Sequence, residues 1–259
     1  MTDATPAAEL SAILLDDDVS ESLWNAVDTG RMAELVPELL LLQMEQDPIH
    51  KHKDVLAHTI AVVAKTPPDL IVRLGTLFHD IGKPRTRRID KHEGVTFRHH
   101  EVVGARITEA RLSELGYDDQ TVHDVTELVR LSGRFKGFAS GWSDSAVRRY
   151  ARDAGPLLGR LNTLVRCDTT TRNKRKRLEL QEHVDQLELR IAELAEADRR
   201  AAERPDMDGD VVMAYLGLEP GRDVGAALKY LLEIKRTEGD LAGDELERRL
   251  DQWWAERQS

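Results

Sequence analysis

Metal-capable side chains lie on apolar faces of the predicted helices, where isolated polar groups are unfavourable. His58 lies between Val55 and Val62 at three-to-four residue spacing, so it faces inward with them. Asp168 continues a stripe that begins with Leu157, Leu161 and Leu164. An unpaired carboxylate on a buried face costs several kcal/mol. A bound cation is the simplest way to remove that cost.

A further pair, His79-Asp80, ends the apolar segment that runs from Leu70 to Phe78. Gly82 is expected at the position just past this helix, and Pro84 is expected to prevent its continuation. Each polar residue alone has an ordinary explanation, such as a hydrogen-bonded core histidine or a capping aspartate. One divalent ion would satisfy all of them together, and nitrogen with oxygen ligands suits Mn, Fe, Co, Ni or Zn better than Ca, with Mg also acceptable.

Cationic side chains near these positions are candidates for phosphate binding. Lys83 directly follows the His-Asp pair and would neutralise a phosphate oxygen or the Asp80 carboxylate, unless it is a solvated loop lysine. Arg130 and Arg134 have helical spacing, and Arg172 opens a run of five cations in six residues. The alternative for the arginines is a solvated face paired with acidic neighbours.

The elements that must position these groups are helices. Aromatic residues are few, β-branched alternation is scarce, and there is no βαβ alternation, so we expect an all-α fold with at most one short hairpin around 87–98. The expected helices span 7–15, 20–29, 31–45, 53–65, 68–80, 100–115, 120–133, 143–153, 156–170, 174–203, 208–216, 223–237 and 243–257.

Composition narrows the class of protein. The chain has 259 residues, of which 41% are hydrophobic, and a single cysteine excludes a disulfide framework. No apolar run could span a membrane and no secretion signal is visible, so we expect a cytoplasmic protein. The net charge of −10 divides into −9 for 1–57, +9 for 58–177 and −10 for 178–259. Positive potential over the middle segment would attract phosphate.

His58, the HDIGKP segment at 79–84 and Asp168 together resemble the HD superfamily of metal-dependent phosphohydrolases. Within it, the chain is similar to the HD-containing body of actinobacterial CCA-adding tRNA nucleotidyltransferases over about residues 20–240. The stretches that carry this similarity are DPIHKHKDVLAHTIAVV, LGTLFHDIGKP, FRHHEVVGA, WSDSAVRRYARDAGPLL and LVRCDTTTRNKRK.

The resemblance implies a multi-helix HD bundle in which His58, His79, Asp80 and Asp168 are the metal ligands. It also implies that His100, in a His-x-x-x-Gly setting, reaches the metal-bound water or the substrate phosphate. His50 and His52 precede the inward-facing stripe and are expected beside the ligands or on the surface.

The chain departs from the nucleotidyltransferase pattern in two respects. We find no segment suited to be the catalytic head domain, because the Asp-rich loop at 206–210 lies between helices rather than on a strand. Members of the family often carry histidine where Ser132 stands, and its loss favours one metal over two.

These observations favour a metal-dependent phosphohydrolase. The expected substrates are nucleoside monophosphates, 2′,3′-cyclic nucleotides, and 2′-phosphorylated or cyclic RNA ends. The alternatives are an RNA-binding module that holds tRNA, and one subunit of a split nucleotidyltransferase.

The expected domains are an N-terminal helical segment at 1–46, an HD domain at 47–203 and a C-terminal helical appendage at 204–259. The apolar positions of the 174–203 helix either pack on their own domain or form a homodimer seam.

Overall fold

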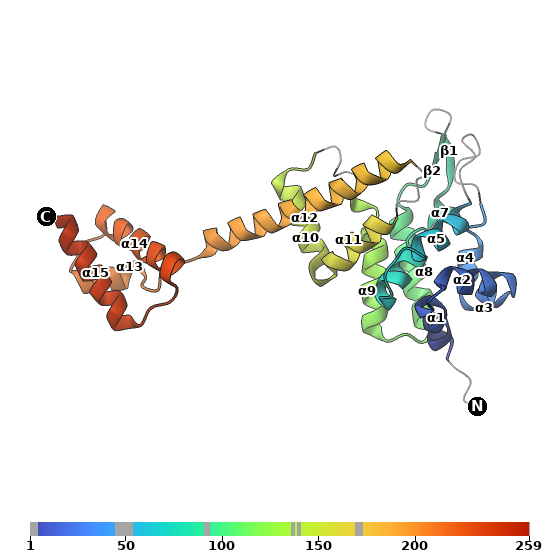
Figure 1. Cartoon of the computed structure of the whole chain (residues 1–259), viewed down its shortest axis with the longest axis horizontal. Helices are drawn as coiled ribbons and strands as arrows, with labels where there is room; N and C mark the ends of the chain where they lie inside the picture. Colours follow the sequence, from blue (N-terminus) through green and yellow to red (C-terminus); the bar gives the residue numbers. More distant parts are fainter. Residues whose placement is uncertain are drawn as a thin grey trace. The chain divides into compact units, whose positions relative to one another are not determined.

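The structure is a computed structural model that describes residues 5–44, 54–90, 94–135, 138, 141–168 and 173–258. Helices dominate these residues, which confirms the all-α prediction (Figure 1). The first part of the chain contains α1 (Pro6–Leu15), α2 (Val19–Asp28), α3 (Arg31–Leu35), α4 (Pro37–Leu40), α5 (Val55–Val63), α6 (Leu70–Phe78), α7 (Lys83–Thr86), α8 (His100–Leu115) and α9 (Asp119–Leu131). The second part contains α10 (Asp144–Ala154), a 3₁₀ turn (Gly155–Leu157), α11 (Leu158–Cys167), α12 (Lys174–Ala202), α13 (Gly209–Leu216), α14 (Arg222–Glu238) and α15 (Gly243–Gln258).

The described residues contain one small sheet. Strands β1 (Arg88–Asp90) and β2 (Gly94–Thr96) pair antiparallel, with Ile89 opposite Val95. The hairpin lies where the Thr- and Gly-containing sequence lacks helical spacing, so this prediction is confirmed.

Side-chain caps fix where the helices that carry the site begin. Asp54 accepts a hydrogen bond from the backbone N–H of Ala57 at the start of α5, and Asp69 does the same for Val72 in α6. Such caps satisfy backbone donors that have no partner within the helix. The first turns of both helices are therefore held in register with the chain that precedes them.

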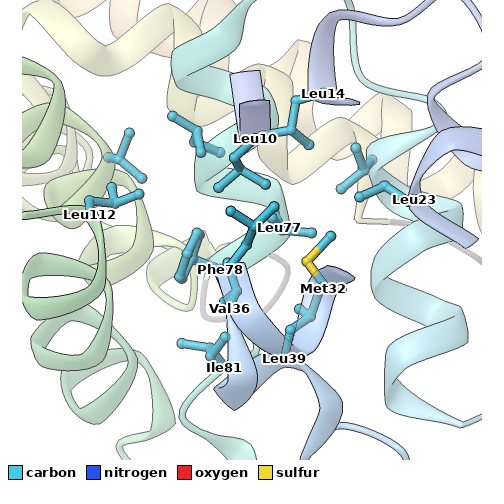
Figure 2. Packing of buried hydrophobic residues seen from close by; sticks show 14 of the residues in the cluster. Leu10, Leu14, Leu23, Met32, Val36, Leu39, Leu77, Phe78, Ile81 and Leu112 are labelled. Carbon is cyan, nitrogen blue, oxygen red and sulfur yellow. The ribbon is translucent and has the colours of Figure 1, made fainter. Parts of the chain in front are cut away.

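Helix α6 lies at the centre of the fold. It packs against α1, α5, α9 and α11, and every residue from Val72 to Phe78 is buried. Its apolar side chains Leu77 and Phe78 contact Leu10, Met32 and Leu39 from the N-terminal helices (Figure 2). A helix enclosed on all sides has little freedom to move, so the polar residues at its end are held in fixed positions.

The chain divides within α12 into two compact units, which span residues 1–192 and 193–259. The first unit contains the α6-centred core, and the second has its own core, which includes Val212, Ala227, Leu231 and Leu250. The domain boundaries expected at 46/47 and 203/204 stay predictions. Val184 and Leu187 of α12 are buried within the chain, as packing of this helix on its own domain predicts.

Two local predictions are wrong. A continuous helix over 31–45 is interrupted at Val36, because Pro37 lacks a backbone N–H and forces an extended conformation on the residue before it. Gly82 was expected at the position just past α6, but that helix ends at Phe78 and Gly82, with a φ of −80°, leads into α7, in which Pro84 occupies the first turn. Among the described residues, no helix is both long and apolar enough to cross a membrane.

Candidate metal centre

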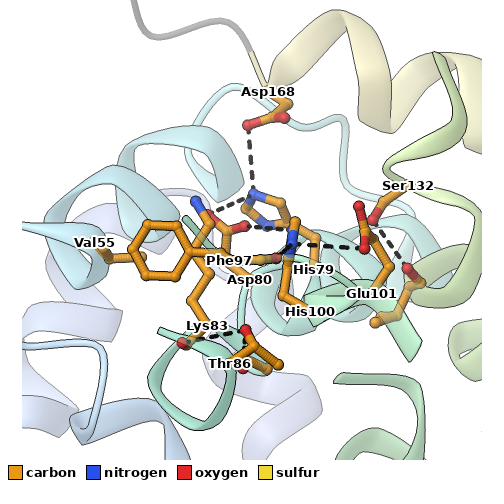
Figure 3. A network of polar contacts seen from close by, with 12 residues as sticks. Val55, His79, Asp80, Lys83, Thr86, Phe97, His100, Glu101, Ser132 and Asp168 are labelled. Carbon is orange, nitrogen blue, oxygen red and sulfur yellow. Dashed lines mark hydrogen bonds and ion pairs between the residues drawn. The ribbon is translucent and has the colours of Figure 1, made fainter. Parts of the chain in front are cut away.

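Three helices bring the metal-capable side chains together. His58 lies in α5, His79 directly follows α6, and Asp168 directly follows α11. Because α6 packs against both α5 and α11, its C-terminal end lies next to the other two residues. Figure 3 shows Asp168 reaching toward the histidine pair from the helix above them.

The donor atoms lie within metal-binding distance of one another. The ligand atoms of His58, His79 and Asp168 are all within 4.8 Å of each other. The Nε2 atom of His58 is 3.0 Å from Oδ1 of Asp168, and Nε2 of His79 is 3.4 Å from the same oxygen. Asp80 lies beside this group, with its Oδ2 atom 3.3 Å from Nε2 of His79 and 3.7 Å from Nε2 of His58.

The imidazole of His79 supplies a direct test of whether a cation fits. Its Nδ1 atom is 2.7 Å from the backbone oxygen of Thr76, to which it donates a hydrogen bond, so Nε2 is the nitrogen left for a ligand. Nε2 is buried and has no hydrogen-bond partner among the described residues. A nitrogen lone pair facing two carboxylates is repelled by them, and a positive ion between them removes that repulsion. The donor set therefore fits a divalent cation with nitrogen and oxygen ligands.

Electrostatics in the metal-free protein agree with this assignment. Burial opposes a charge on His79, but the carboxylates of Asp80 and Asp168 outweigh burial and raise the pKa of His79 to about 10. Asp80 is buried and Asp168 is partly buried, yet the nearby cationic groups hold the pKa of each carboxyl group below its usual value. In the metal-free protein, protonated His79 therefore supplies positive charge beside the two carboxylates.

Lys83 is buried beside Asp80. Its ammonium group donates a hydrogen bond to Oδ2 of Asp80 over 2.7 Å, and only 6% of the residue is exposed. The ammonium also lies 5.6 Å from the ring centre of Phe97. The alternative of a solvated loop lysine is excluded, because the turn after α6 directs this side chain inward.

His100 approaches Asp80 from the opposite side. As the first residue of α8, it donates a hydrogen bond from Nδ1 to the backbone oxygen of Phe97 over 2.8 Å. Its Nε2 atom is 3.6 Å from Oδ1 of Asp80. The preceding residue, His99, has a φ of 61°, a left-handed conformation that is uncommon for a residue other than glycine. This backbone turn accompanies the inward position of His100.

Close backbone approaches explain two glycines near the site. A Cβ atom on Gly82 would lie 2.1 Å from the backbone oxygen of His100, so only glycine lets α8 begin this close to the His-Asp turn. A Cβ atom on Gly133 would lie 1.9 Å from the carboxylate of Glu101. Glu101 in turn lies 3.5 Å from Nδ1 of His100, beside Ser132 at the end of α9 (Figure 3).

The arginines predicted to bind substrate are engaged elsewhere. Arg130 pairs with Glu127 and lines a cavity between α8 and α9, whereas Arg134 pairs with Asp153. Among the described residues, no ion pair joins either arginine to the His-Asp group, and their role in substrate binding stays a prediction. Arg172, His50 and His52 lie outside the described residues.

Sequence reasoning missed two contributors to this site. Phe97 anchors His100 through its backbone oxygen and covers Lys83 with its ring, and Glu101 lies against Gly133. The glycine opposite Glu101 is the one sequence signal for such a contact, but glycine alone does not say which side chain fills the space it leaves.

The fold and this site define a class of protein. The HD domain family model matches residues 54–203, which is more than half of the chain and includes His58, the His79-Asp80 pair and Asp168. The chain therefore belongs to the HD domain family.

Two relatives of the chain are tRNA nucleotidyltransferases. The chain is 30% identical over 255 residues to an A-adding tRNA nucleotidyltransferase of Deinococcus radiodurans, covering 96% of this chain and 57% of the relative. It is 32% identical over 254 residues to a CC-adding tRNA nucleotidyltransferase of Thermus thermophilus, covering 95% of this chain and 55% of the relative. The chain thus spans a little over half the length of the relatives it matches.

Proposed function

We propose that this protein is a metal-dependent phosphohydrolase that cleaves phosphate esters of nucleotides. The substrates are nucleoside monophosphates, 2′,3′-cyclic nucleotides, or RNA ends that carry a 2′-phosphate or a cyclic phosphate. Membership of the HD domain family supports the reaction class. The single observation that carries the proposal is the buried Nε2 atom of His79, which faces two carboxylates and has no hydrogen-bond partner in the part of the chain that the structure describes.

In this proposal His58, His79, Asp80 and Asp168 hold the ion. A bound divalent cation polarises the phosphoryl oxygen and lowers the pKa of a coordinated water. Nδ1 of His79, bonded to Thr76, fixes the ring so that Nε2 faces the ion.

The remaining side chains handle protons and charge. Oδ2 of Asp80 is held by Lys83, which orients the carboxyl group and leaves Oδ1 to accept a proton from the attacking water. Lys83, and His100 when it is protonated, place positive charge beside that carboxylate, where the phosphate gains negative charge in the transition state.

A hydrolysis panel tests the proposal. Metal-stripped protein reloaded separately with Mn, Fe, Co, Ni, Zn and Mg is assayed on nucleoside monophosphates, 2′,3′-cyclic nucleotides and 2′-phosphorylated oligonucleotides. We expect metal-dependent release of phosphate or ring opening, lost in His79→Gln and Asp168→Asn and retained in His123→Gln, whose histidine is exposed on α9. Activity that persists in both site variants after metal removal contradicts the proposal.

Similarity to two tRNA nucleotidyltransferases over at least 95% of the chain favours a second candidate. In it the protein is a module that holds tRNA, alone or as a subunit beside a separate catalytic head chain, and the metal is structural. This candidate predicts RNA binding whose affinity falls steeply with salt, because each contacted phosphate releases counterions. RNA binding without phosphate release in the panel favours it over the hydrolase.

A further inference from the structure

A second cleft lies on α10, formed by residues outside the metal centre. It has a volume of about 470 Å³ and is lined by Arg134, Trp142, Ala146, Arg149 and Tyr150. Clefts that bind small ligands usually measure roughly 300–1,000 Å³. None of these five residues has a role in the metal centre described above.

One wall of the cleft is aromatic and rigid. The rings of Trp142 and Tyr150 lie 5.4 Å apart, and the ring of Phe138 meets the edge of Trp142 at 5.5 Å. Tyr150 is only 3% exposed, and its hydroxyl donates a hydrogen bond to Asn162 of α11 over 2.8 Å. Trp142 therefore packs against a tyrosine whose position is fixed by its hydrogen bond to Asn162. Trp142 itself is only partly buried.

The cleft also carries positive charge. Arg134 is anchored by its ion pair with Asp153. Arg149 is exposed and, together with Arg134 and Arg152, lies near enough to Asp153 to lower the pKa of that carboxyl group. Residues 134–153 contain five basic side chains and two acidic side chains, in a chain whose net charge is −10. This local excess of positive charge favours an anionic ligand.

We propose that this cleft binds a nucleotide, with the base stacked on Trp142 and the phosphate paired with Arg149 and Arg134. Base stacking on aromatic side chains combined with a basic groove is how proteins bind unpaired nucleotides. An aliphatic anion would leave the aromatic wall uncovered, and a neutral aromatic ligand would make no use of the exposed guanidinium group of Arg149. The nucleotide is either free in solution or an unpaired residue of an RNA strand. The proposal does not rest on hydrolysis at the metal centre.

Binding measurements on the full chain test this inference. Adenosine monophosphate is titrated by calorimetry, and a short single-stranded oligoadenylate with a fluorescent label is titrated by anisotropy. The variants are Arg149→Ala, Trp142→Ala and Trp142→Phe, the last of which keeps an aromatic ring. Arg152→Ala is the matched control, because it removes the same charge from the same helix at a residue that does not line the cleft. All titrations use metal-stripped protein, so that neither hydrolysis nor metal-dependent binding at the metal centre contributes.

We expect Arg149→Ala and Trp142→Ala to weaken binding by between about five-fold and a hundred-fold. Trp142→Phe and Arg152→Ala should stay within about three-fold of the unmodified protein. Equal affinity per site for the monophosphate and the oligonucleotide identifies a free nucleotide as ligand, whereas much tighter oligonucleotide binding identifies an RNA strand. If Trp142→Ala fails to fold, the comparison of Arg149→Ala with Arg152→Ala still tests the proposal, because Arg149 is exposed. No binding at millimolar monophosphate and micromolar oligonucleotide, or equal losses in Arg149→Ala and Arg152→Ala, overturns the inference.

Discussion

The chemistry of the metal centre depends on which contact each ring nitrogen and each carboxylate oxygen makes. His79 gives one ring nitrogen to the backbone of Thr76 and turns the other toward Asp80 and Asp168. Lys83 takes one oxygen of Asp80, and His100 lies near the other. Each group is thus fixed by a contact outside the ion's own coordination shell, which is how proteins orient metal ligands.

Metal binding should therefore release protons at neutral pH. The pKa of His79 is raised to about 10 in the metal-free protein, so the ring is protonated at pH 7.5 and must lose its proton before Nε2 binds an ion. The affinity for metal should rise as the pH increases toward 10. Calorimetry in two buffers with different ionisation enthalpies measures the release, which we expect to be about one proton per ion. A value near zero at pH 7.5 would contradict a protonated His79 ring in the metal-free protein.

Removing the Lys83 ammonium should destabilise the protein. Lys83→Met leaves the buried Asp80 carboxylate without its closest cation, and breaking a buried ion pair costs roughly 3 kcal/mol. The free energy of unfolding, measured with urea on metal-free protein, checks this value. Lys176→Met, at an exposed lysine of α12, is the control and should change stability by less than about 0.5 kcal/mol. Equal effects in the two variants would contradict the buried pair.

Much of the site could be predicted from sequence, because a polar residue on an apolar helix face needs a partner inside the protein. That reasoning selected His58 and Asp168, which the structure brings to 3.0 Å from each other. It could not decide between a buried and a solvated Lys83. That choice depends on how the chain turns after α6, and the turn depends on a contact with His100 far along the sequence.

At the scale of elements, the site depends on how closely α8 approaches the His-Asp turn. The backbone of Gly82 lies against the backbone of His100 and Gly104, so this contact sets the depth at which α8 begins. Helix α6 is held from all sides and provides the fixed reference for that contact. The distance between His100 and Asp80 is a consequence of this packing.

A methyl group at Gly82 should separate these elements. In Gly82→Ala the new Cβ atom would lie 2.1 Å from the oxygen of His100 and 2.6 Å from the nitrogen of Gly104, and neither backbone atom can move freely. We expect a loss of about 3 kcal/mol in the free energy of unfolding, as for overpacked cores.

The matched control for this change is Gly159→Ala in α11, where the new Cβ atom meets nothing within 4 Å. It should be neutral or stabilise the protein by up to about 1 kcal/mol, because alanine favours helices more than glycine does. If urea unfolding gives the same stability for both variants, the result contradicts the close approach of the Gly82 backbone to the backbone of His100.

Helix positions followed from the sequence because caps and apolar spacing are local signals. The start of α10 at Asp144 and the full extent of α8 match the predicted ranges within one residue. The prediction failed at Val36 and at Gly82. Pro37 interrupts an otherwise periodic pattern at the first position, and a tertiary contact rather than a backbone preference explains the glycine at the second.

The whole molecule consists of two compact units, each with its own core. The metal-capable residues all belong to the unit that spans 1–192, and the unit that spans 193–259 packs α13, α14 and α15 around Leu231. Cores that share no side chains should respond separately to mutation. The sequence indicated an appendage through its Asp-rich loop at 206–210, but a compact unit that starts within α12 has no local signal.

Truncation of a core residue in the C-terminal unit should leave the metal centre intact. Leu231→Ala removes a side chain that is 1% exposed, and such changes cost about 2–5 kcal/mol. We expect the 193–259 unit to unfold at lower denaturant concentration while metal content stays at the level of the unmodified protein. Loss of metal in Leu231→Ala would show that the two units depend on each other.

Metal content tests the central claim most directly. Purified protein is stripped, reloaded with each of the transition metals named above, freed of excess metal and analysed by inductively coupled plasma mass spectrometry. We predict about one divalent ion per chain, lost in His79→Gln and in Asp168→Asn and retained in His123→Gln. Full metal content in both site variants, or none in the unmodified protein with any of these metals, would contradict a metal centre formed by His58, His79, Asp80 and Asp168.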